Sequence, residues 1–345
     1  MNATSVRLTT VAIGFVVAAV VLTGMLALVG FEATFAAIAT ADRLVLASLL
    51  VVVACWFGVW AYTLSVVLGI LEVEHTPVDA VVLFGNVVFA NSVAPSTYLG
   101  GEPLAALLLS RYTGRDYETG FAAVASVDLL NYAPMLPLAG IGLLYVVTTA
   151  VVGRTVEIAL AFVFLVLLAL MATVVVGWRR RDRLLTVAAV VLGGLSQKMD
   201  AVVPGVHAVS PATFERRLGQ FAANVERVSG DHYSLGLSLV YSTAGWALLS
   251  GVLWLALYAV GHAVEPEVVL FVVPLGAVSN VLPLPGGLGS VEPVFVVLLV
   301  AMTGITAPDA TAATLLYRSG TYWLPLLFGV VTVAVANVPV PRPTN

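Results

Sequence analysis

Six stretches of the chain are long and apolar enough to cross a membrane as single helices. They are residues 8–29, 44–71, 119–149, 156–177, 234–260 and 310–334. A transmembrane helix needs about 20 mostly apolar residues. Only 10% of the residues are charged, whereas soluble domains carry about 25%. The chain is therefore predicted to be an all-α polytopic membrane protein. Residues 8–29 exceed the apolar length of about 7–15 residues found in signal peptides, so we expect a retained anchor.

Two further apolar zones, residues 78–113 and 268–304, are interrupted in their middle. The interruptions read NSVAPSTYLGGEP, from Asn91 to Pro103, and NVLPLPGGLGSVEP, from Asn280 to Pro293. Proline and glycine at this density cannot continue a helix. Irregular backbone at membrane depth is tolerated only where it is buried in protein or lines a hydrated cavity. Each zone is predicted to form a re-entrant hairpin, because reading both zones as full crossings would place Arg7 and Arg342 outside and fit the positive-inside rule less well.

The two zones share one order of residues: asparagine, glycines, a Glu-Pro pair, and a tyrosine 30 positions after the glutamate. These residues are Asn91, Gly100, Gly101, Glu102 and Tyr132 in the first zone, and Asn280, Gly286, Gly287, Gly289, Glu292 and Tyr322 in the second. The match predicts an inverted repeat within one integral membrane domain, 1–345. Repeat one covers about 44–149 and repeat two about 234–334. In such repeats the binding site lies near the bilayer midplane.

Residues 178–233 form the one long polar segment and hold 8 of the 15 basic residues. The positive-inside rule places this connector in the cytoplasm. With re-entrant hairpins, both termini are then predicted to be cytoplasmic, in a multi-pass protein of the cell membrane. Residues 211–228 have the spacing of an amphipathic helix, which either packs on the cytoplasmic face or binds anionic lipid headgroups.

Four ionisable residues fall at membrane depth: Glu102, Asp128, Glu292 and Arg318. An ionised side chain at the bilayer centre costs about 2.5–3.5 kcal/mol on insertion scales. The four must therefore pair, bind protons or face a hydrated cavity. The repeat predicts that Asp128 pairs with Arg318, with Glu292 or Glu102 competing for the same arginine. Two interpretations stay open: a fixed ion pair that joins the halves, or a site for a polar headgroup or coupling ion.

Enzyme and metal signatures are not found in the sequence. The four histidines lack the His-Glu-x-x-His spacing of zinc proteases, and no Gly-x-Ser-x-Gly elbow occurs. The glycines at 286–289 could cradle a phosphate through their amides, but no Lys-Ser/Thr of a P-loop follows. We therefore expect neither an enzyme nor a cofactor, and the net charge of −4 gives no reason to expect a nucleic-acid partner.

Taken with LLYRSGTYWLP, the two interrupted motifs resemble the transmembrane region of lysylphosphatidylglycerol synthases, the flippase-like UPF0104 family. The resemblance covers roughly residues 40–335. It implies movement of lipids such as aminoacylated phosphatidylglycerol between leaflets, or a place in glycolipid or polyprenol-linked sugar pathways. It also implies headgroup contacts for Glu102, Gly289, Glu292 and Arg318. The chain departs from the family at Ala105, Asp128 and Asn131, where an arginine, a basic residue and an acid are usual.

The sequence thus predicts a translocator of a lipid or glycolipid headgroup, with membrane lipids or a lipid-linked sugar as its ligand. Two alternatives stay open: an ion-coupled transporter of a small solute, and a non-catalytic membrane partner of a glycosyltransferase that docks through residues 178–233. The candidate substrate-binding residues are Asn91, Gly100, Gly101, Glu102, Asp128, Asn131, Asn280, Gly286, Gly287, Gly289, Glu292, Arg318 and Tyr322.

Overall fold

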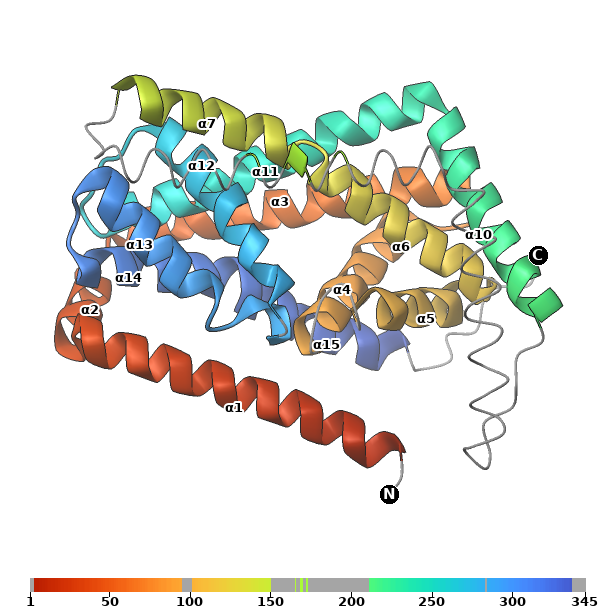
Figure 1. Cartoon of the computed structure of the whole chain (residues 1–345), viewed down its shortest axis with the longest axis horizontal. Coiled ribbons are helices and arrows are strands. Elements are labelled where there is room, and N and C mark those ends of the chain that lie inside the picture. Colours follow the sequence, from red (N-terminus) through yellow and green to blue (C-terminus); the bar gives the residue numbers. More distant parts are fainter. Residues whose placement is uncertain are drawn as a thin grey trace.

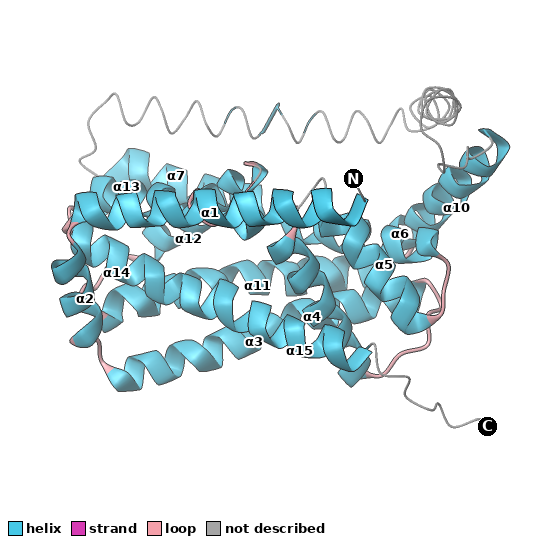
Figure 2. Ribbon diagram, turned by 90° about the horizontal axis from the view of Figure 1, so that it is seen from below, coloured by secondary structure: helices cyan, strands magenta, loops and turns pink. Residues whose placement is uncertain are grey.

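The protein is a bundle of helices built around two long central ones. A computed structural model describes residues 3–94, 101–149, 165, 168, 169, 172, 211–282 and 284–336, and every regular element among them is a helix. Helices α3 (Arg43–Ile70) and α11 (His232–Ala259) are 28 residues each and pack side by side along the long axis (Figures 1 and 2). The predicted all-α polytopic membrane fold is confirmed.

Among the residues that the structure describes, four helical segments are long and apolar enough to cross a membrane, and a bent pair would make a fifth. They are Arg43–Ile70, Tyr117–Ile141, His232–Ala259 and Pro285–Thr303, and the bent pair is Val16–Val29 with Phe31–Ala39. Apart from residues 165, 168, 169 and 172, the predicted span at 156–177 lies outside the described residues, and so does the connector at 178–210.

Both central helices begin with an aspartate that caps their free backbone N–H groups. The Asp42 carboxylate accepts hydrogen bonds from the backbone of Leu44 at 2.7 Å and of Val45 at 3.3 Å. The Asp231 carboxylate accepts from Ser234 at 3.1 Å, and this hydrogen bonding lowers the pKa of Asp231 below its usual value. Ionised oxygens at a helix N-terminus also interact favourably with the helix dipole. The caps therefore fix where the two spans start.

The two predicted interruptions are confirmed. The first zone folds as α4 (Pro77–Val93) and α5 (Glu102–Thr113), and the second as α12 (Pro266–Ala277), η2 (Val278–Val281), η3 (Pro285–Gly287) and α13 (Val291–Thr303). Figures 1 and 2 show α4 and α5 toward one end of the central pair, and α12 and α13 toward the other. Because α4 packs against η3, the two interruptions meet inside the bundle. The inverted repeat and the re-entrant topology stay predictions.

Two predicted spans are helical but contain an irregular turn. Residues 119–149 divide into α6 (Tyr117–Tyr132) and α7 (Met135–Thr149) at Pro134, which has no N–H for the helix ladder. Residues 310–334 divide into α14 (Ala307–Arg318), a π-helical turn η4 (Ser319–Trp323) and α15 (Leu324–Ala336). Residues 307–336 are helical without a break, so the expected helix over 310–334 is present with one π turn inside it, and π turns of this kind occur frequently at functional sites.

The first helix runs along one edge of the bundle (Figure 1). Helix α1 (Ala3–Val29) turns by 89° into α2 (Phe31–Ala39) at Gly30, whose φ of 110° is open to glycine. Its buried residue Ala18 clusters with Leu288 and Tyr322. Helix α1 therefore covers the glycine-rich turn of the second zone.

The predicted amphipathic helix is present as α10 (Pro211–Gly230). Its residues Val225 and Val228 are buried. The Phe221 ring lies 5.4 Å from that of Phe121 in α6. The apolar face of α10 therefore packs on the bundle. This favours the interpretation that the helix packs on the protein over the one in which it binds anionic lipid headgroups.

We expect Gly276→Ala to lower the stability of the folded protein. A Cβ atom at Gly276 would lie 1.8 Å from Cε1 of Phe295, whose side chain is buried, so the ring or the helix would have to shift. Overpacking of this kind costs about 1–3 kcal/mol. Gly69→Ala is the matched control, because nothing lies within 4 Å of its added Cβ and alanine favours a helix by about 1 kcal/mol over glycine. Thermal unfolding in detergent should show a lower Tm for the first variant only; equal Tm values would contradict this packing.

Candidate functional site

A buried ion pair joins the second interruption to the end of α14. Arg318 Nε donates to Glu292 Oε1 at 2.7 Å, and the two residues are 8% and 1% exposed. Glu292 Oε2 also accepts from the backbone N–H of Gly289 at 2.7 Å. Arg318 Nη2 donates to the carbonyl of Gly286 at 2.8 Å. Each charge thus has a second, backbone partner, as a buried pair requires for stability.

The glycine turn lets the backbone come this close to the pair. Gly286 and Gly287 have φ values of +54° and +67°, a region that other residues rarely adopt. A Cβ atom at Gly286 would lie 2.1 Å from the Tyr322 ring, and one at Gly287 would lie 2.0 Å from Oδ1 of Asn280. Glycine is therefore required here both by conformation and by space.

Tyr322 connects the ion pair to the first interruption. Its ring lies 4.6 Å from Arg318 Cζ, in a cation–π contact that adds about 0.5–2 kcal/mol. Its hydroxyl donates to the carbonyl of Ser92, near the end of α4, at 3.4 Å. The two interrupted zones are therefore linked through one side chain.

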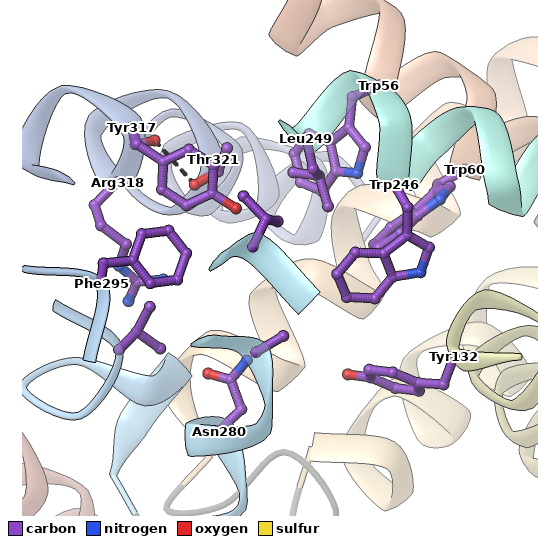
Figure 3. Close-up of a pocket in the computed structure, with 13 residues that line it drawn as sticks. Trp56, Trp60, Tyr132, Trp246, Leu249, Asn280, Phe295, Tyr317, Arg318 and Thr321 are labelled. Carbon is purple, nitrogen blue, oxygen red and sulfur yellow. Dashed lines mark hydrogen bonds between the residues drawn. The ribbon is translucent and has the colours of Figure 1, made fainter. Parts of the chain in front are cut away.

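Beside the ion pair lies a cavity of about 150 Å³ (Figure 3). Arg318 and Phe295 line one side, and Trp56, Trp60 and Trp246 line the other. Asn280 and Tyr132 face each other across the cavity, and Thr321 lines it beside Tyr317. Trp56 and Trp246 stand halfway along the spans α3 and α11, so the cavity lies at the mid-depth of these two helices.

The tryptophans of this wall differ in their hydrogen bonding. Trp246 Nε1 donates to the carbonyl of Asn131 at 2.5 Å, and Asn131 Oδ1 accepts from Ser242 at 2.8 Å. Trp56 Nε1 and Trp60 Nε1 are shielded and have no partner within the described part of the chain. The Trp60 nitrogen lies against Gly245, and both indoles line the cavity (Figure 3). A buried donor without a partner costs about 1–3 kcal/mol.

The predicted residues of the first zone form a separate group. Gly101 lies against Asn91, because an added Cβ would be 2.3 Å from Oδ1 of the asparagine. Glu102 and Asp128 are both partly buried, and their carboxylates are close enough to repel each other. Asn91 Oδ1 and Asp128 Oδ2 have no hydrogen-bond partner among residues that the structure describes. Gly100 lies outside those residues.

The predicted pairing of Asp128 with Arg318 was wrong. Arg318 pairs with Glu292, the competing partner that the sequence also offered, which belongs to its own half of the chain. Aligning the two zones shows which positions correspond, but corresponding positions in a repeat need not touch. Asn131, another predicted binding residue, acts as a hydrogen-bond partner for α11. The second-zone residues Asn280, Gly286, Gly287, Gly289, Glu292, Arg318 and Tyr322 do come together.

The tryptophan wall was missed by the sequence analysis, although a signal was present. Trp56 and Trp60 are spaced i, i+4, which puts them on one helix face. They and Trp246 stand in the middle of their spans, whereas tryptophan in membrane proteins is enriched at the two interfaces. Tryptophans far from both interfaces could therefore have predicted an aromatic-lined cavity in the middle of these spans.

These observations define a class: a polytopic membrane protein with a charged, aromatic-lined cavity at the mid-depth of its central spans. The chain belongs to the family described as lysylphosphatidylglycerol synthase TM region, which matches residues 11–329. A UPF0104 membrane protein of Methanothermobacter thermautotrophicus is 26% identical over 249 residues, covering 70% of this chain and 71% of that protein. A UPF0104 membrane protein of Pyrococcus horikoshii is 23% identical over 252 residues, covering 71% of this chain and 73% of that protein.

A third similarity covers less of the chain. The glycosyltransferase AglD of Haloferax volcanii is 30% identical over 124 residues, which is 34% of this chain and 20% of AglD. Part of this chain is thus similar to a minor part of a larger protein.

We expect the Glu292–Arg318 pair to show strong coupling in a double-mutant cycle. Glu292→Gln or Arg318→Gln alone leaves an unpaired buried charge, which costs about 3–5 kcal/mol of unfolding free energy. The double variant leaves two neutral amides and should lose less than the sum of the two. Arg227→Gln is the control, because its 3.6 Å pair with Glu72 is exposed and such pairs contribute about 0–1 kcal/mol. Additive losses, measured by denaturant unfolding in detergent, would contradict the coupling.

Proposed function

We propose that this chain moves a lipid headgroup between the two leaflets and holds it at mid-depth in the cavity beside Arg318. The observation that carries the proposal is the place of that cavity, halfway along α3 and α11. A polar headgroup that crosses hydrocarbon loses its hydration, which costs several kcal/mol for each unpaired polar group. Arg318, Asn280 and Thr321 supply polar contacts where that loss is greatest.

The arrangement of the interrupted zones supports the same proposal. Helices α4 and α5 lie toward one end of the central pair, α12 and α13 toward the other, and α4 meets η3 (Figures 1 and 2). Two re-entrant hairpins that enter from opposite sides would have this arrangement, which is the design of inverted-repeat transporters. We propose that the headgroup passes between the hairpin ends while its chains stay in lipid. In this scheme both termini are cytoplasmic and the protein resides in the cell membrane.

A second candidate role is that of a non-catalytic membrane partner for a glycosyltransferase. The observation that favours it is the similarity between part of this chain and part of the glycosyltransferase AglD. The two roles are compatible, since a translocator can deliver lipid to a bound transferase. Co-purification of a transferase with the full chain would support this second role, and the proposal assigns no catalytic step to this chain itself.

We expect Ala277→Leu to slow lipid translocation severalfold, because it adds side-chain volume to a cavity of only about 150 Å³. Val297→Leu adds a methylene group on the exposed surface of α13, where Val297 is 66% exposed, and serves as the control. The protein is reconstituted into vesicles with either NBD-labelled phosphatidylglycerol or an NBD-labelled citronellyl phosphate that carries glucose. Dithionite then bleaches the probe in the outer leaflet, and the protected fraction reports translocation.

Two results would contradict translocation through this cavity. One is that neither probe becomes accessible faster than in protein-free vesicles. The other is that Ala277→Leu and Val297→Leu support the same rate as the unaltered chain. Circular dichroism and Tm of each variant separate a blocked cavity from a protein that did not fold.

A further inference from the structure

We infer that Pro134 and Pro325 are two hinges, and that they let the two ends of the bundle move against each other around the cavity. The inference rests on the proposed function, because it names the movement by which a headgroup held at mid-depth is passed on. At these two prolines the chain crosses from one apolar core of the bundle to the other.

The buried apolar residues form two large cores, one toward each end of the bundle. The first-zone core joins α4, α5 and α6 to the second part of α3 and includes Phe84. The second-zone core joins α12, α13 and α14 to α11 and to the first part of α3, and it includes Phe271. Along α3 the change of core falls between Trp56 and Ala61. The cavity, which Trp56 lines, therefore lies at the border between the two cores.

The last helix of each half packs on the interrupted zone of the other half. Helix α7 packs chiefly against α12, and α15 chiefly against α4 (Figure 1). Leu130 of α6 is buried in the first-zone core, whereas Met135 of α7 is buried in the second-zone core. In return, α15 lies close against α4, since a Cβ atom at Gly329 would be 2.7 Å from the carbonyl oxygen of Gly85. A shift of one core therefore pulls on the last helix of the other half.

Each crossing contains a proline that leaves the helix ladder incomplete. Pro134 stands between α6 and α7, and Pro325 near the start of α15. Proline has no N–H for the carbonyl four positions earlier, and its ring crowds that carbonyl. Just before Pro325 the ladder is accordingly widened, and the Leu324 N–H donates to the carbonyl of Ser319. Prolines and π turns are the places at which helices bend, so bending is easier at the two crossings than within α6 or α14.

Both crossings adjoin the cavity, so bending at either one changes its shape. Tyr132 shortly precedes Pro134, Thr321 shortly precedes Pro325, and both line the cavity. Close-packed bodies can shift only by breaking their contacts, whereas a cavity has no contacts to break. Helices α3 and α11 pass both cores without a break and serve as the axis, since helices of this length can curve gently.

The two ends of the π turn η4 are held by different cores. Before the turn, Arg318 donates to Glu292 of α13 at 2.7 Å. Within it, the Tyr322 hydroxyl donates to the carbonyl of Ser92 in α4 at 3.4 Å. A displacement of one core relative to the other therefore moves Tyr322 relative to Arg318. The charged side of the cavity changes shape as a result.

Spin labels on the two sides of each hinge measure this movement. One pair is placed at Leu129 of α6 and Leu144 of α7, and the other at Val297 of α13 and Val331 of α15, all of which are exposed. The labels are attached to cysteines in the full chain, with the one native cysteine replaced by Cys55→Ala. Distances are measured by double electron–electron resonance in lipid nanodiscs. We expect two distance populations for each pair, because a carrier without ligand populates both of its states.

Alanine at each proline tests the hinges. Pro134→Ala and Pro325→Ala restore an N–H to the ladder. Each should leave one distance population at its own hinge and slow lipid translocation severalfold, with a Tm equal to or above that of the unaltered chain. Because the last helices are exchanged, Pro134→Ala should also reduce the second population of the Val297–Val331 pair. Pro266→Ala is the control, since Pro266 is exposed in the first turn of α12, where proline leaves no ladder bond missing.

Any of three results would overturn the hinges: one population at either pair in the unaltered chain, the same two populations in both hinge variants as in Pro266→Ala, or an unchanged Val297–Val331 pair in Pro134→Ala. The vesicle experiment separates these results from a failure of the proposed function. If the second populations are lost as expected but neither labelled lipid is translocated, the hinges stand and translocation is wrong. If both hinge variants translocate lipid at the unaltered rate, translocation stands and the hinges are wrong.

Discussion

A buried charge pair inside a membrane protein controls much of the structure around it. Glu292 and Arg318 are almost completely shielded, and neither can be ionised there at acceptable cost without the other. Their geometry requires a carbonyl and an N–H from the glycine turn, at Gly286 and Gly289. The turn in turn requires φ values that only glycine adopts readily. The irregular backbone of the second zone therefore supplies the hydrogen-bonding groups that stabilise the ion pair.

The sequence could predict this much because the requirements are local. Charged residues at membrane depth, glycine runs and Glu-Pro pairs are visible along the chain, and they located both interruptions and most of the second-zone cluster. Partner choice was not visible, because it depends on how α14 returns to α13 in space. Aligning the two zones showed that Asp128 and Arg318 occupy corresponding positions, which does not mean that their side chains touch. In the structure Arg318 pairs with Glu292 instead. The cavity wall was also hidden, since Trp56 and Trp246 are 190 positions apart in sequence and meet only when α3 packs on α11.

The two interrupted zones carry unequal charge, and this difference bears on what each can do. The second zone pairs one acid with one arginine, so its charges are compensated. The first zone brings the two acids Glu102 and Asp128 within range of each other, next to an Asn91 oxygen that has no partner among the described residues. The cavity adjoins the second zone, where Arg318 lines it and Glu292 compensates the charge of the arginine.

The position of the tryptophans is the remaining constraint on function. A large indole in the middle of a span gains nothing from the polar interface, where tryptophan is usually found. Lipid-facing packing would be served as well by leucine, which carries no N–H that needs a partner. Trp56 nevertheless has a shielded N–H without a partner in the described chain, and it stands at mid-depth beside a cavity that Arg318 also lines. A donor left unpaired at this depth lowers stability. Trp56 therefore costs the bundle stability that a leucine at the same position would not cost.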